Sequence, residues 1–170
     1  MRIIGVLWLI LIIFGCEQSR DLPTVAEVDL NRYQGRWYEI ATFPIRPQRY
    51  CIGTYAEYKL NKNGYIEVYN HCIDSTDNSV KDISGKAFVE TAGDNSRLLV
   101  QFFWPFKAPY QIIALDTVDY QYVLVGSPNR KYLWILSRHP QLAAITYAVL
   151  VDRAKMLGFP VEKLVLTKHP

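Results

Sequence analysis

Cysteine and histidine are the residues of this chain best suited to act as nucleophiles, general bases or metal ligands. The six are Cys16, Cys51, Cys72, His71, His139 and His169. The histidines lie far apart in sequence, and the cysteines lack the companions that a metal site or a catalytic pair requires. The chain has no Gly-x-Ser-x-Gly, His-Glu-x-x-His or phosphate-loop motif. We therefore expect no enzyme activity, no cofactor and no metal ion.

The composition is that of one globular domain rich in tyrosine. The chain has 170 residues, of which 50% are hydrophobic, 14% aromatic and 21% charged. These proportions exclude disordered, collagen-like and coiled-coil proteins, and the length suits a single core. A formal charge of +3, with Lys and Arg evenly spread, does not indicate nucleic-acid binding. We expect no nucleic-acid partner.

An apolar run at the N-terminus has the features of an export signal. After Arg2, residues 3–14 are apolar almost without a break, which is shorter than the ~20 residues of a bilayer-spanning helix. The run ends in Ile-Phe-Gly-Cys, which resembles the lipobox of bacterial lipoprotein precursors. We expect residues 1–15 to be removed as a signal peptide and Cys16 to carry the lipid anchor. The alternative is plain secretion, with Cys16 left as an ordinary thiol.

The residues after this cysteine indicate where the lipidated protein resides. Several acyl chains on Cys16 would anchor the protein stably, unlike a single chain. In the bacterial sorting pattern that the segment resembles, Asp in the next position favours inner-membrane retention, so Glu17 indicates the outer membrane. Residues 16–29 are polar with one proline, and we expect them to form a lipidated tether.

The middle of the chain alternates short apolar runs with turn residues about every eight to twelve residues, which is typical of antiparallel strands. We expect eight strands, near residues 36–43, 53–61, 65–74, 82–91, 97–104, 109–115, 119–126 and 132–138. Eight strands suffice for an all-β, up-and-down barrel that holds one small ligand. A C-terminal helix over 141–158 and a short final strand over 161–167 follow. The apolar residues of the helix are Leu142, Ile145, Ala148, Val149, Met156 and Leu157.

One hairpin can be assigned to inward and outward faces. Lys62–Gly64 suits a three-residue loop that pairs Tyr58 with Val68. On the outer face, Lys59 would then lie opposite Glu67 as an ion pair. Alternation directs the other set of side chains into the interior, namely Thr54, Ala56, Tyr58, Leu60, Ile66, Val68, Asn70 and Cys72.

The same hairpin brings Cys51 and Cys72 to one end of the sheet. Exported proteins oxidise such pairs, so we expect a disulfide; the alternative is two free thiols too far apart to react. The bond would pin the loop 44–52 to the barrel rim, and the chain-entropy model gives it ~3 kcal/mol.

Three segments resemble the conserved regions of the lipocalins. The first is Gly35–Ala41, which carries Gly-x-Trp; the second is Asp116–Tyr122 and the third is Leu133–Arg138. They occur in the order found in that family, with a helix and a strand after them. The resemblance implies a lipocalin domain over residues 30–168, most similar to the bacterial outer-membrane members.

The resemblance also implies structural roles for four residues. In the family, the residue matching Trp37 plugs the closed end of the barrel, and the one matching Arg138 lies over its ring as a cation, a contact worth roughly 0.5–2 kcal/mol. Gly35 would let the chain turn tightly into the first strand. Asp119 belongs to the second conserved segment. We expect these residues to stabilise the fold and not to bind ligand.

Alternation and the resemblance together predict a mainly aromatic cavity lining. The predicted residues are Tyr58, Asn70, Phe102, Trp104 and Trp134. Such a cavity suits a fatty acid or a lysophospholipid, because tail burial contributes ~0.8 kcal/mol per methylene while Asn70 and a tyrosine hydroxyl orient the head group. The alternative is that the aromatic side chains fill the barrel.

Two loops near the presumed mouth offer further contacts. Arg46 and Arg49 either attract an anionic head group or are simply solvated. Trp104-Pro105-Phe106 presents aromatic side chains suited to a membrane surface or to a second subunit in a homodimer.

We therefore expect a lipid-anchored carrier in the cell outer membrane, facing the periplasm, that stores or transports fatty acids or lysophospholipids for membrane maintenance. Its biological purpose is implied by the resemblance alone. Two alternatives stay open: an enzyme acting on a lipid or isoprenoid inside the barrel, and a structural lipoprotein with a filled barrel.

Overall fold

The computed structural model describes residues 22–170, so the predicted signal peptide and Cys16 lie outside the described residues. Among residues 22–170, neither helix has the length and the apolar character that spanning a bilayer demands of a helix. The elements are α1 (Leu30–Tyr33), β1 (Gly35–Thr42), the 3-10 turn η1 (Arg46–Gln48), β2 (Cys51–Leu60), β3 (Ile66–Asp74), β4 (Val80–Thr91), β5 (Asp94–Phe103), β6 (Phe106–Leu115), β7 (Tyr122–Gly126), β8 (Leu133–Ser137), α2 (Ala144–Met156), the 3-10 turn η2 (Val161–Lys163) and β9 (Val165–Leu166).

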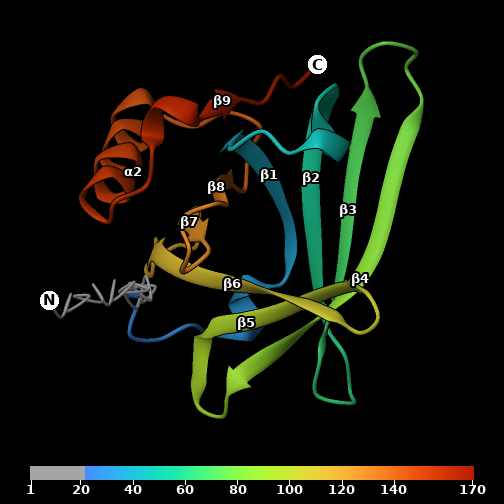
Figure 1. Cartoon of the computed structure of the whole chain (residues 1–170). Helices are drawn as coiled ribbons and strands as arrows, with labels where there is room; N and C mark the ends of the chain where they lie inside the picture. The colour runs from blue at the N-terminus through green and yellow to red at the C-terminus, as the bar shows by residue number, and fades with distance from the viewer. Residues whose placement is uncertain (1–21) are drawn as a thin grey trace, which may run out of the picture.

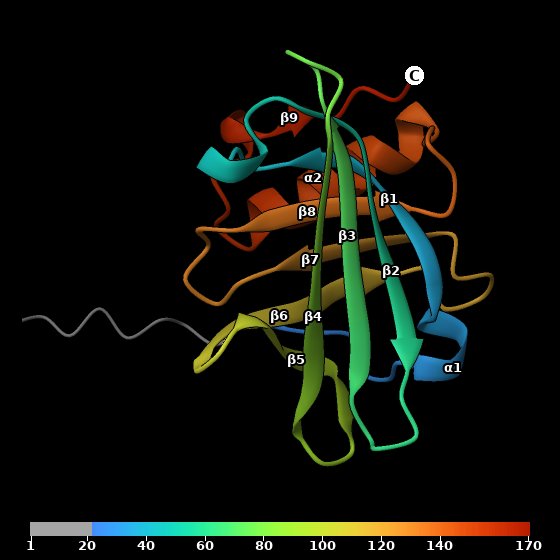
Figure 2. The same ribbon diagram turned by 90° about the vertical axis from the view of Figure 1, so that its right-hand side faces the viewer.

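The strands form one antiparallel sheet that closes on itself (Figure 1). From β2 to β8 each strand pairs with the next along the chain, and β1 pairs with both β8 and β2. The predicted eight-stranded up-and-down barrel is therefore confirmed, with β9 added as a further partner of β1. Figure 2 looks onto β2, β3 and β4, with α1 at the lower end of the barrel and the C-terminus at the upper end.

The β2–β3 hairpin has the predicted register. Tyr58 pairs with Val68, and both side chains are buried. Lys59 lies opposite Glu67, as expected, but no ion pair joins them in the described part of the chain. Instead the Glu67 carboxylate accepts a hydrogen bond from the side-chain amide of Asn61 at the start of the turn. The prediction of a cross-strand ion pair is therefore wrong.

The segment before β7 is a turn and not the start of a strand. The carboxylate of Asp116 accepts hydrogen bonds from the backbone N–H groups of Val118, Asp119 and Gln121. Local bonds of this kind compete with strand pairing, so β7 begins at Tyr122 and not at the predicted residue 119. The side chain that organises the second conserved segment is thus Asp116, whereas Asp119 contributes backbone groups.

Leu142 and Leu157, which flank helix α2, pack against the barrel cluster, but within α2 the buried face differs from the one predicted. Ile145, Val149 and Met156 are 74%, 59% and 73% exposed. The residues that pack against the barrel cluster follow the i, i+3, i+4, i+7 pattern of one helix face, namely Tyr147, Leu150, Val151 and Ala154. Apolar residues occur on more than one side of this helix, so their spacing alone did not identify the buried side.

Two apolar clusters lie on opposite sides of the barrel wall. One lies inside the barrel. The other lies between α2 and the outer faces of β1, β6, β7 and β8, and includes Ile40, Ile113, Leu124, Ile135 and Leu150 (Figure 1). Full burial of such side chains contributes about 1.5–3 kcal/mol each. The outer cluster adds apolar burial to that of the barrel interior, so the stability of the fold does not depend on a completely filled interior alone.

Residues 22–28 pack onto the barrel. Leu22 and Val28 are buried, and the backbone N–H of Val25 donates to the carbonyl of Ile112 at 3.0 Å. Residues 22–29 therefore do not form the tether that we expected. Leu22, Val25 and Val28 recur at every third position and lie against the barrel. At the C-terminal end, the strand predicted over 161–167 is reduced to β9, preceded by η2.

The signature residues close the lower end of the barrel. Trp37 is fully buried, and its Nε1 donates to the carbonyl of Tyr33 at 2.8 Å. The Arg138 Cζ lies 3.8 Å from the centroid of the Trp37 ring. Gly35 has a φ of +91°, and a Cβ there would lie 3.4 Å from a guanidinium nitrogen of Arg138. The Arg138 guanidinium also donates to the backbone carbonyls of Arg32, Arg36 and Tyr120.

Candidate ligand cavity

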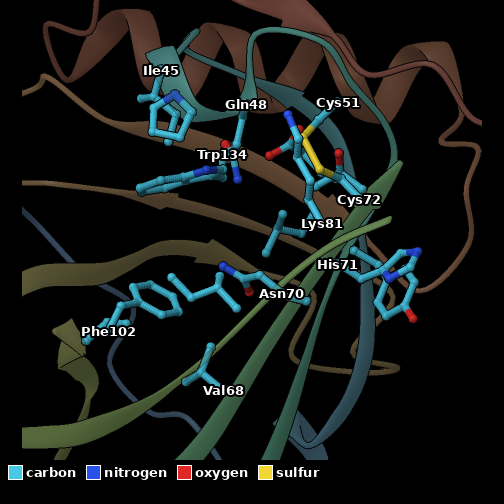
Figure 3. Close-up of a pocket in the computed structure, with 18 of the residues that line it drawn as sticks. Ile45, Gln48, Cys51, Val68, Asn70, His71, Cys72, Lys81, Phe102 and Trp134 are labelled. Atoms are coloured by element: carbon cyan, nitrogen blue, oxygen red, sulfur yellow. A yellow bond between two sulfur atoms is a disulfide. The ribbon is translucent and has the colours of Figure 1, made fainter. Parts of the chain in front are cut away.

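The barrel interior holds a cavity of about 440 Å³, which is within the usual range for small-molecule sites. Its lining comes from β1 to β6, from β8, and from the loop that contains η1. Four of the predicted lining residues border it: Tyr58, Asn70, Phe102 and Trp134. Figure 3 shows Asn70, Phe102 and Trp134 around the cavity, with Val68 below them in this view.

Trp104 does not reach the cavity, and the prediction that it does is corrected. Strand β5 ends at Phe103, and Trp104 lies in the turn to β6, where it is 86% exposed. The β5–β6 ladder is irregular between Val100 and Phe103. Alternation therefore holds as far as Phe102 and fails beyond the end of the strand. Trp104 joins Phe103 and Phe106 as an exposed aromatic residue.

Three tyrosines form a hydrogen-bonded chain at the floor of the cavity. The Tyr58 hydroxyl donates to that of Tyr110 at 3.0 Å, and the hydroxyls of Tyr110 and Tyr33 are 2.7 Å apart. Burial raises the pKa of Tyr58 to about 12 and the pKa values of the other two well above the usual range. The Tyr58 hydroxyl is thus already bonded within the floor. Sequence reasoning missed Tyr110, although alternation with Ile112 places it on the inward face.

Trp134 forms a flat apolar wall above this floor. Its ring stacks on Tyr132, with the centroids 6.0 Å apart and the planes 8° apart. The ring also lies near that of Tyr110, with the centroids 6.4 Å apart and the planes 26° apart. Stacked aromatic rings hold one another in place, so this wall offers a rigid surface to an acyl chain.

Polar atoms without partners lie in the cavity lining. The Oε1 of Gln48, the Oγ1 of Thr54 and the Oδ1 of Asn70 are buried and make no hydrogen bond to any described residue. All three residues border the cavity. Figure 3 shows Gln48 on the loop above and Asn70 deeper in the cavity. A buried polar atom without a partner costs about 1–3 kcal/mol, so these atoms favour a ligand that supplies one.

A carboxyl group, that of Glu39, also borders the cavity. Glu39 lies two residues after Trp37 on β1, is 5% exposed, and accepts a hydrogen bond from the Thr167 hydroxyl at 2.7 Å. Burial raises the pKa of Glu39 to about 7, and the bond from Thr167 opposes this rise. Sequence reasoning placed Glu39 only in the signature segment. Alternation from Trp37 would have directed it inward.

The C-terminal residues cover the side of the barrel next to Glu39. The β1–β2 ladder runs only over Gly35–Tyr38 on β1, so the two strands diverge above it. In this gap the backbone N–H of Gly53 donates to the carbonyl of Lys168 at 2.7 Å. The Nε2 of His169 donates to the carbonyl of Glu39, also at 2.7 Å. The tail thus takes the place of the missing strand pairing.

A disulfide holds the mouth loop. Cys51 and Cys72 are bonded, with their Cα atoms 5.4 Å apart. The loop that carries η1 enters β2 at this bond, and the backbone N–H of Ser75 donates to the carbonyl of Tyr50 at 2.8 Å. Both interactions attach the loop to β3, so Gln48 is held over the mouth.

The charged groups of the lining are mostly paired with one another. Lys81 bonds to the Asp74 carboxylate, and this interaction holds the pKa of Asp74 at about 2. His71 and Asp82 are joined at 2.7 Å. Arg46 and Arg49 are exposed in the mouth loop and do not border the cavity. Among the residues of the lining, Glu39 is the carboxyl without a basic partner.

Comparison with known proteins places these features in a family. Residues 28–169 match the family model of the lipocalin-like domain. The chain is 36% identical over 156 residues to temperature-induced lipocalin-1 of Arabidopsis thaliana, covering 86% of this chain and 82% of that protein. It is 36% identical over 151 residues to outer membrane lipoprotein Blc of Escherichia coli K12, covering 89% and 85%. It is 34% identical over 152 residues to apolipoprotein D of Bos taurus, covering 85% and 79%.

Solved structures share the fold at lower sequence identity. Insecticyanin from the tobacco hornworm Manduca sexta is 21% identical with a TM-score of 0.69, covering 87% of this chain and 84% of that one. Apocrustacyanin C1 gives the same identity and TM-score, covering 84% and 80%. Together with the sequence matches over most of the chain and the Trp37–Arg138 closure of the barrel, they show that this protein is a member of the lipocalin family.

Proposed function

We propose that the protein is a carrier that binds a single-chain amphiphile, a fatty acid or a lysophospholipid, inside its barrel. The observation that carries the proposal is the cavity itself, with aromatic and aliphatic side chains at its floor and walls and unpaired polar atoms in the lining. Each methylene buried there contributes ~0.8 kcal/mol, and polar atoms without protein partners are suited to a head group.

We further propose that Cys16 anchors this carrier to the outer membrane, on the periplasmic side, where it stores or moves lipids for membrane maintenance. The lipobox-like segment ending at Cys16 supports the anchor. The similarity to proteins named outer membrane lipoprotein supports the location. A carrier in that position can take up amphiphiles that leave the bilayer.

The two alternatives have less support. A cavity of about 440 Å³ argues against a filled barrel. For an enzyme, the inward-facing Cys72 would be the candidate nucleophile, but it forms the disulfide with Cys51. Residues 22–170 also contain no group of three or more His, Cys, Asp and Glu side chains placed to hold a metal ion.

Native mass spectrometry of the purified protein separates the three functions. The protein is delipidated and then incubated with palmitic acid or with palmitoyl-lysophosphatidylethanolamine. A carrier gains the mass of one intact lipid. An enzyme releases altered lipid, and a filled barrel gains nothing; either outcome would overturn the proposal.

A further inference from the structure

We infer that the mouth end of the barrel is a docking surface for an anionic lipid bilayer, formed by exposed aromatic side chains with basic residues around them. This surface goes beyond the proposed ligand and the proposed anchor, because it sets how the barrel is oriented on the membrane. In the docked orientation the cavity opens onto the bilayer, so an amphiphile passes between the two without crossing bulk water.

The mouth end is made of four connections between strands. In an up-and-down barrel alternate connections lie at the same end, so those that follow β1, β3, β5 and β7 share one end. The loop that contains η1 follows β1 and borders the cavity, which identifies this end as the mouth. In Figure 2 η1 and the turns β5–β6 and β7–β8 lie along the left-hand side, away from α1.

Exposed aromatic side chains gather at the mouth. Phe103, Trp104 and Phe106 are 68%, 86% and 76% exposed. Phe103 pairs with Phe106, so Trp104 lies at the tip of a tight turn. Two further exposed aromatic residues, Tyr50 and Tyr132, belong to neighbouring connections. Exposed apolar patches mark interaction sites, and aromatic side chains are enriched where proteins meet the bilayer interface.

The opposite end of the barrel has no comparable patch in the part of the chain that the structure describes. Its three connections between strands are residues 61–65, 92–93 and 116–121. They contribute one large exposed apolar side chain, that of Val118. The aromatic patch is therefore a property of the mouth and not of strand connections in general.

Basic residues accompany the aromatic ones at the mouth. The four connections there contain one acidic residue, Asp77, and four basic residues, namely Arg46, Arg49, Arg130 and Lys131. The three connections at the opposite end contain one basic residue and two acidic ones. A bilayer with anionic lipid attracts clustered basic residues, and this attraction adds to the burial of apolar side chains in the interface.

The same charges favour a bilayer over a second copy of the chain. In a symmetric dimer formed through this patch, each copy would present the same surface to the other. The basic residues of the two copies would then face one another, and like charges across an interface are unfavourable. A bilayer that contains anionic lipid instead pairs the basic residues while it buries the aromatic ones.

The patch is continuous with the cavity. Tyr132 stacks on Trp134, with the ring centroids 6.0 Å apart, and Trp134 borders the cavity. Gln48, between Pro47 and Arg49 in the mouth loop, also borders it (Figure 3). An acyl chain that leaves the bilayer at this patch therefore meets the wall of the cavity directly.

The N-terminal segment leads towards the same end of the barrel. The Asn95 side chain donates to the carbonyl of Val28 at 3.0 Å, and that of Arg97 donates to the carbonyl of Leu22 at 3.2 Å. Because β5 runs from the closed end to the mouth, Leu22 lies nearer the mouth than Val28. Cys16 is six residues before Leu22, a reach of at most about 20 Å. The proposed anchor, on which this one step rests, therefore keeps the mouth close to the bilayer.

Tryptophan fluorescence tests the docking, because Trp104 lies at the tip of the patch. The purified protein is mixed with vesicles of three parts phosphatidylethanolamine to one part phosphatidylglycerol, with the phosphatidylethanolamine brominated near the upper end of one acyl chain. Bromine quenches an indole ring only at short range. We expect wild-type emission to be quenched relative to vesicles without bromine, and most of this quenching to be lost in Trp104→Phe.

A matched pair of variants keeps the reporter and changes the patch. Phe106→Glu places a negative charge beside Trp104 and should reduce the quenching, because it replaces an apolar contact and repels anionic lipid. Ile145→Glu makes the same change in charge on α2, at a side chain that is 74% exposed, and should leave the quenching unchanged.

The docking is refuted if the brominated vesicles do not quench the wild type, or if the two glutamate variants behave alike. Quenching that survives in Trp104→Phe and disappears in Trp134→Phe would place the brominated lipid in the cavity, which overturns the docking and leaves the carrier function standing. A dimer in native mass spectrometry that Trp104→Ala dissociates, without quenching by vesicles, would assign the patch to a second copy. Uptake of palmitic acid by the delipidated protein tests the carrier function separately, so the two failures are distinguishable.

Discussion

Replacing Glu39 by glutamine should stabilise the protein at alkaline pH relative to the wild type and have a smaller effect at acid pH. Glu39 is 5% exposed, and burial raises its pKa from 4.5 to about 7. The folded protein therefore holds this proton more tightly than the unfolded chain does. By linkage, the stability contributed by the protonated form is present below pH 4.5 and is lost as the pH rises through 7.

The size of the effect follows from the two pKa values. The interval from 4.5 to about 7, at 1.36 kcal/mol per unit, amounts to about 3 kcal/mol. Glutamine carries no proton to lose, and its side-chain oxygen can still accept the hydrogen bond from Thr167. The wild type should therefore lose about 3 kcal/mol between pH 4.5 and pH 8.5 that Glu39→Gln retains.

Urea unfolding of both proteins, with the disulfide intact, measures this difference. The free energy of unfolding of Glu39→Gln minus that of the wild type should be larger at pH 8.5 than at pH 5 by roughly 2–3 kcal/mol. Glu90→Gln, which makes the same chemical change at an exposed position on β4, should show no such trend. A difference that is equal at both pH values would refute the buried, proton-retaining carboxyl.

Three further predictions test the cavity, the mouth and the anchor. Trp134→Ala should weaken binding of a hexadecyl probe by tenfold or more, since a buried aromatic contact worth about 2 kcal/mol is lost, whereas Trp104→Ala should leave the dissociation constant within about twofold; equal losses would contradict the assigned lining. Reduction of the Cys51–Cys72 bond should lower the free energy of unfolding by about 3 kcal/mol, as chemical denaturation with and without reductant can measure, and an unchanged midpoint would show that the bond does not constrain the chain. Cys16→Ser should abolish labelling by radioactive palmitate, and labelling that persists would place the lipid elsewhere.

The strands of the barrel could be predicted from the sequence because side chains along a strand point alternately to its two faces. Side chains alternate at every residue, so one turn at Lys62–Gly64 was enough to set the register of Tyr58 against Val68 and to sort both strands into faces. The same rule fails where a strand stops. Pro105 marked a turn after β5, but it did not decide whether Phe103 or Trp104 was the last residue of the strand. Trp104 was therefore listed in the cavity lining as well as in the loop, and it lies in the exposed turn.

Features that depend on distant contacts could not be read from the sequence. Glu39 and Thr167 are separated by 128 residues, and the bond between them depends on the divergence of β1 and β2 above Tyr38. The buried side of α2 was likewise ambiguous, because Ile145 and Leu150 are both apolar and only the position of the barrel wall decides between them. Non-local packing of this kind overrides periodicity.

A crystal structure of the protein loaded with an amphiphile brominated at the end of its tail tests the central claim most directly. We expect an anomalous bromine peak near the floor formed by Tyr58 and Tyr110, with the head group at the level of Glu39 and Asn70. A bromine peak on the outer surface near Trp104, or an interior without bound lipid at saturating ligand, would contradict it.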